Sequence, residues 1–174
     1  RALVARCRSG DLQALEALVV EYQKPVYNAA YRILGNRDDA ADATQATFLK
    51  AFENLDSYDP QYKFFSWIYR IVINESINQS KRIRRQEPLD EGEPGTEPGP
   101  DDEVETSHLA REIQDGLMAL SEDYRTVIML RHFADLSYRQ ISDILRIPEK
   151  TVKSRLYSAR QLMKDQLVAN GISL

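Results

Sequence analysis

Cysteine and long apolar runs are what this 174-residue sequence most clearly lacks. Cys7 is the only cysteine, so no internal disulfide can form, as is typical of proteins in the reducing cytoplasm. No apolar run approaches the ~20 residues that a transmembrane helix needs, so we expect no membrane insertion. Both absences favour a cytoplasmic protein, and the 43% of hydrophobic residues is enough to build hydrophobic cores.

Residue types that carry catalysis or bind metals are also scarce. The two histidines, His108 and His132, stand far apart and have no metal-ligand spacing to Cys7. There is no glycine-rich phosphate loop. The aspartates at 38–42 could be imagined as metal ligands, but acids at a helix start more often complement the helix dipole. We therefore expect no catalytic residue, no metal site and no cofactor, and we do not expect an enzyme.

The net charge of −4 hides an uneven distribution. Residues 1–86 carry 13 Lys or Arg against 10 Asp or Glu, and residues 107–174 carry 10 against 8. Residues 87–106 carry nine acids, four prolines, three glycines and no cation. Such a segment cannot bury enough apolar surface to fold, so the composition predicts a flexible, acidic, disordered linker between two mildly basic domains.

Strand-length segments of alternating polarity are absent, and apolar residues recur instead at helical spacing. The predicted fold class is all-α, with two small helical domains on either side of the linker. Pro25 is expected to kink or break the second helix near Lys24, and Gly35 to end it. The expected helices cover residues 2–8, 12–34, 38–55, 64–85, 107–120, 122–133, 137–145 and 148–164.

The stretch 136–164 reads as two helices joined by a tight corner. Ser137 and Gln140 have the spacing of a capping box at the start of the first helix. Arg146 stands at the corner, where glycine is usual because the backbone needs a positive φ, so we expect a tolerable but strained residue there. Pro148 suits the first turn of the second helix. Together these features predict a helix-turn-helix.

The second of these helices has two different faces. Its apolar residues fall within a narrow wedge at ~100° per residue: Val152, Leu156, Ala159 and Met163. The opposite side carries cations and hydrogen-bond donors: Lys150, Lys153, Ser154, Tyr157, Ser158, Arg160 and Gln161. A basic face alone is common on ordinary packed helices. In a helix-turn-helix, however, it is what a recognition helix in the DNA major groove needs.

Aromatic residues cluster where a polar loop at 56–63 meets the fourth helix. Aromatic rings beside cations can stack unpaired bases, although most of these rings could be core, as we expect for Phe64 and Trp67. Tyr58 and Tyr62 lie in the polar loop and are predicted at the surface. The helix ends in a basic run of five residues, which fits phosphate contacts and simple complementarity to the helix dipole equally well.

Four stretches carry a family resemblance. They are D-A-A-D-A-T-Q-A-T-F-L-K-A-F at 39–52, F-F-S-W-I-Y-R-I-V-I-N at 64–74, L-S-E-D-Y-R at 120–125, and the helix-turn-helix. In this order they resemble the bacterial extracytoplasmic-function (ECF) sigma factors of the sigma-70 family, over almost the whole chain. The resemblance implies a factor that binds core RNA polymerase and directs promoter-specific initiation, including promoter melting. It also implies sigma region 2 at 1–86 and sigma region 4 at 107–174.

The resemblance further carries functional sites onto this chain. The helix at 38–55 would contact polymerase through Asp42, Gln45 and Phe48, although Phe48 could equally be core. Minus-ten DNA would be held by Tyr58, Tyr62, Lys63, Phe65, Asn74, Lys81, Arg82, Arg84 and Arg85. The minus-thirty-five element would be read by Lys150, Thr151, Lys153, Ser154, Arg155, Tyr157, Ser158 and Arg160. The implied partners are core RNA polymerase, duplex promoter DNA, the melted non-template strand and an anti-sigma factor.

Two other functions stay open on the sequence alone. A conventional regulator would pair this C-terminal helix-turn-helix with an N-terminal ligand domain and would bind a palindrome without polymerase. A protein-interaction adaptor would show no dependence on DNA. The aromatic loop and the absence of an obvious pocket-forming segment favour the sigma factor. Departures from the family pattern bear on which promoter is read, and they fall at Ala46, Gln140, Ser142, Arg146 and Ser158.

Overall fold

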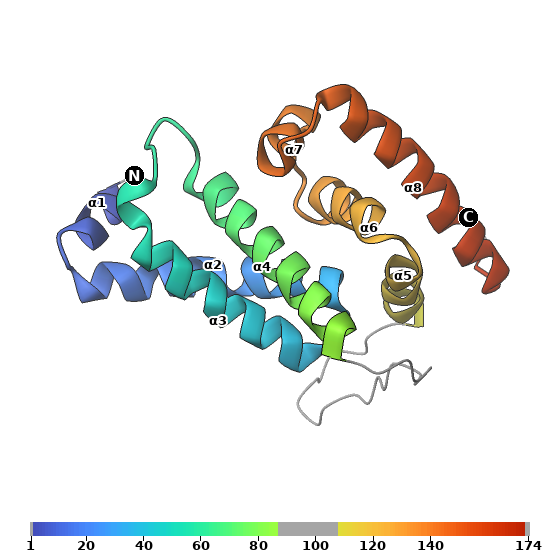
Figure 1. Cartoon of the computed structure of the whole chain (residues 1–174), viewed down its shortest axis with the longest axis horizontal. Coiled ribbons are helices and arrows are strands. Elements are labelled where there is room, and N and C mark those ends of the chain that lie inside the picture. The colour runs from blue at the N-terminus through green and yellow to red at the C-terminus, as the bar shows by residue number, and fades with distance from the viewer. Residues whose placement is uncertain (1, 87–107, 173–174) are drawn as a thin grey trace.

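The computed structural model describes residues 2–86 and 108–172, which form two groups of helices (Figure 1). The first group contains α1 (Ala2–Arg8), α2 (Leu12–Leu34), α3 (Arg37–Glu53), the 3-10 turn η1 (Leu55–Ser57) and α4 (Phe64–Gln86). The second contains α5 (His108–Ala119), α6 (Glu122–Ile128), the π-helical turn η2 (Met129–Phe133), α7 (Tyr138–Leu145) and α8 (Glu149–Ala169). No strand occurs in the described residues, and the predicted all-α fold is confirmed. The predicted linker at 87–106 lies outside them.

In the first group α2, α3 and α4 pack together around a core of fully buried aliphatic side chains. Short-range chemistry explains where these helices begin and end. Asp11 caps α2 by accepting from the Ala14 backbone N–H at 3.2 Å, and Asn36 caps α3 by accepting from two N–H groups of its first turn. Gly35 ends α2 with a φ of 72°, a conformation that glycine adopts without strain.

The predicted break at Pro25 is wrong, because α2 continues without interruption through this residue. Proline removes one backbone donor and its ring presses on the preceding turn, which costs about 3 kcal/mol in a helix interior. Burial on both sides offsets this cost, since Leu18 and Val26 lie in the same core. The Tyr69 hydroxyl also donates to the Pro25 carbonyl at 3.3 Å. Tertiary packing therefore keeps one long helix where local chemistry favours two.

The second group ends in the predicted helix-turn-helix, formed by α7 and α8. The Ser137 hydroxyl accepts from the Gln140 N–H at 3.2 Å, and the Gln140 side chain accepts from the Ser137 N–H at 2.9 Å, so the capping box is confirmed. Arg146 forms the corner with the expected positive φ, 55°. The Ser142 hydroxyl donates to the Ile147 carbonyl at 2.6 Å across this corner. That hydrogen bond helps hold the chain in the strained turn.

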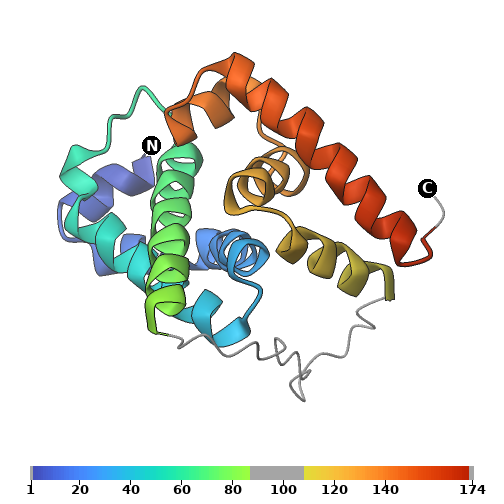
Figure 2. The same ribbon diagram turned by 45° about the vertical axis from the view of Figure 1, so that its right-hand side comes forward.

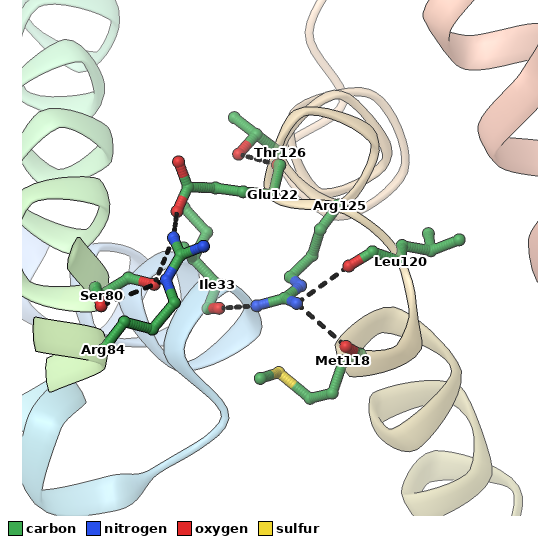
Figure 3. A network of polar contacts seen from close by, with 8 residues as sticks. All are labelled: Ile33, Ser80, Arg84, Met118, Leu120, Glu122, Arg125 and Thr126. Atoms are coloured by element: carbon green, nitrogen blue, oxygen red, sulfur yellow. Dashed lines mark hydrogen bonds and ion pairs between the residues drawn. The ribbon is translucent and has the colours of Figure 1, made fainter. Parts of the chain in front are cut away.

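The two groups lie against each other (Figure 2). Polar side chains bridge them. Helix α2 contacts α5 and α6, and α4 contacts α7. Figure 3 shows a network within this contact. The Arg84 guanidinium of α4 pairs with the Glu122 carboxylate of α6 at 2.7 Å. Arg125 of α6 donates to the Ile33 carbonyl of α2 and to three carbonyls of its own group at the α5–α6 junction.

A second set of bridges surrounds α5 and η2. Gln114 of α5 is only 6% exposed, and both of its hydrogen bonds cross to α2: its oxygen accepts from Arg32 at 2.9 Å, and its nitrogen donates to the Tyr31 carbonyl at 3.2 Å. The Arg32 guanidinium also lies 4.4 Å from the centre of the Phe133 ring. The described residues thus form one compact arrangement rather than two separate bodies.

Candidate nucleic-acid interface

Helix α8 has a buried face and an outward face, as its sequence predicts. Val152, Leu156 and Ala159 have no exposed surface and fix the helix on the second group. Tyr157, which is 69% exposed, is the large apolar side chain on the outward face. Of the other residues assigned to the minus-thirty-five element, four are exposed and three are half-buried: Lys150, Lys153, Ser154 and Arg160 in the first set, and Thr151, Arg155 and Ser158 in the second.

Several of these eight residues have partners within the chain. The Lys153 ammonium lies 5.8 Å from the centre of the Tyr138 ring, and the Ser154 hydroxyl donates to the Thr151 carbonyl at 3.2 Å. Arg155 pairs with Asp123 of α6 at 2.7 Å, and its side chain is 27% exposed. Arg160 donates from Nε to the Nε2 atom of His132 at 3.1 Å. Because Nε2 accepts this hydrogen bond, the proton of neutral His132 lies on Nδ1. Burial, with a further contribution from the Arg160 and Arg131 cations, lowers the pKa of His132 below 6.5 and favours this neutral form.

The two loop tyrosines have opposite environments. Tyr62 is 63% exposed, which confirms its predicted place at the surface. Tyr58 is 3% exposed, so the same prediction for Tyr58 is wrong. Its ring packs edge-on to Phe64 and against Trp67, with ring centres 5.5 and 5.4 Å apart, and its hydroxyl donates to the Tyr62 carbonyl at 2.6 Å. Tyr58 therefore supports the loop from inside, and Tyr62 faces solvent.

The remaining minus-ten candidates are spread along α4. Lys63 lies exposed just before the helix, and Phe65 is half-buried, its ring stacked on Tyr69 with the centres 4.2 Å apart. Asn74 is exposed in the middle of α4. Lys81, Arg82 and Arg85 are exposed near its end, about 24–30 Å from Phe65 at the rise of an α-helix, while Arg84 pairs with Glu122. The candidates thus form a long track rather than one cluster.

The three polymerase candidates do not share one surface. Asp42 and Gln45 are exposed on α3, but Phe48 is 8% exposed and lies in the core beside Phe52. Helix geometry explains this, because Phe48 lies about 120° around α3 from Asp42, whereas Leu49 lies only about 20° away. Leu49 is 59% exposed and shares a groove of about 440 Å³ with Asp42, Gln45 and residues of α4. The residue seven positions after Asp42, nearly two full helical turns away, is therefore the better candidate than the residue six positions after it.

The described residues contain no group of three or more His, Cys, Asp or Glu side chains able to hold a metal ion. None of their helices is long and apolar enough to cross a membrane. The surfaces described above offer hydrogen bonds, cations and exposed rings, which suit binding of nucleic acid and protein.

Two family models match the chain: Sigma-70 region 2 over residues 18–87 and Sigma-70, region 4 over residues 110–163. With the helical fold and the helix-turn-helix, these matches define the class, a sigma-70-type transcription factor. The ECF RNA polymerase sigma factor SigW of Bacillus subtilis is 36% identical over 94% of each chain. The ECF RNA polymerase sigma-E factor of Haemophilus influenzae is 32% identical over 96% of this chain and 94% of its own. The chain belongs to the ECF sigma factors.

Solved structures agree with this assignment. CnrH in complex with the cytosolic domain of CnrY has a TM-score of 0.73 and 25% identity, over 97% of this chain and 96% of that chain. RpoE of Bartonella quintana has the same fold, with a TM-score of 0.72 and 21% identity over 87% of this chain and 95% of that one. As a sigma factor, the protein directs promoter-specific initiation of transcription by RNA polymerase, and it is not itself an enzyme.

Proposed function

We propose that this sigma factor reads its promoter with two surfaces and holds core RNA polymerase with a third. Residues 1–86 act as region 2, residues 107–174 act as region 4, and residues 87–106 link them. The observation that carries the proposal is helix α8, which buries Val152, Leu156 and Ala159 and leaves polar and cationic side chains outward. A helix held in this way can enter a major groove without exposing apolar core.

On α8, Lys153 and Ser154 read bases of the minus-thirty-five element. Both are exposed and lie on the first turns of the helix, the part of a recognition helix that reaches base edges. Lys150, Thr151, Tyr157 and Ser158 flank them. Arg155 and Arg160 hold phosphates, which requires them to exchange Asp123 and His132 for the DNA backbone. Phosphate contacts position the helix and base contacts supply the specificity.

Region 2 binds the minus-ten element along α4 and its preceding loop. Tyr62 and Lys63 meet unpaired bases and the strand at one end, since an exposed ring can stack a base of any kind. Phe65 and Asn74 continue the surface, and Lys81, Arg82, Arg84 and Arg85 hold phosphates at the other end. Tyr58 belongs to the support of this surface, because its ring is buried.

Core polymerase binds the groove between α3 and α4 through Asp42, Gln45 and Leu49. An anti-sigma factor is a second protein partner in this proposal. RpoE of Bartonella quintana was solved with the anti-sigma factor NepR, and CnrH with the cytosolic domain of CnrY. In this chain a groove of about 420 Å³ between the two helix groups offers a place for such a partner, with Arg32, Phe65 and Phe133 in its walls.

In vitro transcription with core polymerase over a library of promoters tests the proposal. Lys153→Ala should weaken transcription by a base-specific amount of about 1–3 kcal/mol at one minus-thirty-five position. Lys164→Ala is the matched control, an exposed cation farther along the same helix and outside the proposed site. Equal weakening of every minus-thirty-five variant by Lys153→Ala would assign Lys153 to the backbone instead.

A further inference from the structure

Arg8, the last residue of α1, is hydrogen-bonded to the loop that precedes α4. Its Nε and Nη2 atoms donate to the Leu55 carbonyl at 3.1 and 3.0 Å. Nη2 also donates to the carbonyls of Asp56, at 3.2 Å, and of Tyr58. One guanidinium therefore gathers three carbonyl oxygens of a tight turn. Helix α1 is itself anchored, because Val4 and Cys7 are buried in the core of the first group.

The contacts continue from Arg8 to the exposed end of the loop. Arg8 holds the Tyr58 carbonyl, the buried Tyr58 ring packs on Phe64, and the Tyr58 hydroxyl donates to the Tyr62 carbonyl at 2.6 Å. The Tyr62 side chain then projects into solvent, 63% exposed. The backbone on either side of the exposed ring is thus fixed to the body of the protein, although the loop has little regular structure.

We infer that Arg8 is a positioning residue for promoter melting: it holds the 55–62 loop so that Tyr62 is already displayed when bases leave the duplex. The inference rests on the proposed role of this loop in holding melted bases. A loop that is ordered beforehand loses less conformational entropy on binding. The match to Sigma-70 region 2 begins at residue 18, so Arg8 lies outside it. The contact that holds the loop therefore comes from α1, which precedes the matched segment.

Arginine suits this task better than lysine. The planar guanidinium has five N–H donors in a fixed fork, whereas an ammonium is a compact charge with three donors on a flexible stem. Lysine at position 8 could therefore hold part of the turn but not all three carbonyls at once. Arg6 provides a matched control on the same helix, because its guanidinium pairs with Asp11 at 2.7 Å, at the start of α2 and not in the loop.

The test uses the full chain with core polymerase and permanganate footprinting of unpaired thymines. Arg8→Gln should reduce thymine reactivity in the bubble about tenfold, as expected when a charge-assisted hydrogen bond is lost. Arg8→Lys should give an intermediate value, and Arg6→Gln the parent value. Core binding should stay unchanged, and a pre-melted promoter should restore transcription by Arg8→Gln. In the free chain, limited proteolysis by trypsin after the exposed Lys63 should accelerate for Arg8→Gln, while cleavage after the exposed Lys150 of the second group should not.

Tyr62→Ala distinguishes the proposed role of the loop from the inferred role of Arg8. If Tyr62→Ala loses the bubble and Arg8→Gln keeps it, the inference about Arg8 is overturned and the role of the loop stands. If Tyr62→Ala opens ordinary duplex promoters as well as the parent, the loop is not the melting site, and both the role of the loop and the inference fail. If Arg8→Gln accelerates proteolysis at every lysine or loses core binding, its role is general stability, which also overturns the inference.

Discussion

At the scale of single residues, Tyr58 and Tyr62 show how far an identical side chain depends on its surroundings. Both occupy a polar loop, and local composition predicts both at the surface. The structure buries Tyr58 between Phe64 and Trp67, whereas Tyr62 remains 63% exposed. Arg8, fifty positions earlier, donates a hydrogen bond to the Tyr58 carbonyl. No pattern within the loop itself carries that information.

This contrast gives a prediction about stability. Tyr58→Ala should lower the free energy of unfolding by about 3–5 kcal/mol, because it leaves a cavity beside the rings of Phe64 and Trp67. Tyr62→Ala should change it by less than about 0.5 kcal/mol, because the side chain lies mostly in water. Urea unfolding monitored by circular dichroism measures both. Tyr58→Phe is the control, with a loss of about 0.5–1.5 kcal/mol for one hydrogen bond. A similar loss for both alanine variants would contradict the different environments.

His132 gives a pH-dependent prediction. Its pKa is lowered in the folded protein, mainly by burial and then by Arg160 and Arg131, so the unfolded chain binds more protons below pH 6.5. The stabilising contribution of neutral His132 should therefore be complete above about pH 6.5 and should be lost as the pH falls through the lowered pKa. Protonation also removes the acceptor that holds Arg160.

His132→Gln should flatten the decrease in the free energy of unfolding between pH 7 and pH 5. Urea titrations across that range measure the slope. His108→Gln is the matched control, because the His108 side chain is 82% exposed and lies 3.6 Å from Glu112, one turn along the same helix. A slope that His132→Gln leaves unchanged would show that other groups set the acid sensitivity.

At the scale of helices, the sequence predicts what local chemistry determines. The end of α2 at Gly35 and the capping box at Ser137 depend on neighbouring residues, and helical spacing identifies the buried face of α8. The failures have a different origin. The continuity of α2 through Pro25 depends on packing between helices, which no short pattern contains.

The polymerase candidates on α3 show what the sequence predicts and what it leaves open. Asp42 and Gln45 were predicted from the family resemblance and are exposed. The sequence allows Phe48 to be either a surface or a core residue. Helical geometry alone turns it inward, so that Leu49 takes the exposed position on this face. Similarly, the outward cations of α8 follow from the sequence, but the pairing of Arg155 with Asp123 depends on the docking of α6 and α8 and could not be predicted.

The corner between α7 and α8 gives a prediction at this scale. Arg146→Gly should raise the free energy of unfolding by about 0.5–1 kcal/mol, because relief of the left-handed backbone, worth about 1–2 kcal/mol, exceeds the added freedom of the unfolded chain. Arg139→Gly is the matched control inside α7, where glycine should lower stability by about 1 kcal/mol. Urea unfolding of the two variants should give opposite signs. A loss for Arg146→Gly would mean that the Arg146 side chain stabilises the corner.

At the scale of the whole molecule, the two helix groups lie against each other in an arrangement that we call closed. This arrangement conflicts with the proposed binding of both promoter elements at once. The minus-ten and minus-thirty-five elements are separated by about 25 base pairs, or about 85 Å of duplex. A compact chain of 174 residues has a radius of gyration of only about 16 Å. If α4 and α8 bind these two elements as we propose, the two helix groups must separate before both elements can be engaged together. In the closed arrangement, moreover, Arg84 is paired with Glu122, although we assign Arg84 to a DNA phosphate.

Glu122→Gln combined with Gln114→Ala should shift the free protein toward an open arrangement. The Arg84 side chain is 62% exposed, so its ion pair contributes only about 0.2–1 kcal/mol, but Gln114 is 6% exposed and both of its hydrogen bonds join the two groups. Double electron–electron resonance measures the distance between the two groups. The spin labels are attached to cysteines introduced at the exposed positions Glu53 and Gln161, in a Cys7→Ser background.

The parent should give one short distance, and the double variant should add a broad, longer population and bind promoter DNA more tightly without polymerase. Glu112→Gln provides the control, because Glu112 bonds to Asn170 within the second group and does not bridge the groups. It removes a carboxylate of the same kind and should leave the short distance unchanged. If the double variant keeps the short distance while its helical signal persists, apolar packing between α2 and α6 rather than the polar bridges holds the protein closed. In that case DNA binding by the free double variant should match that of the parent.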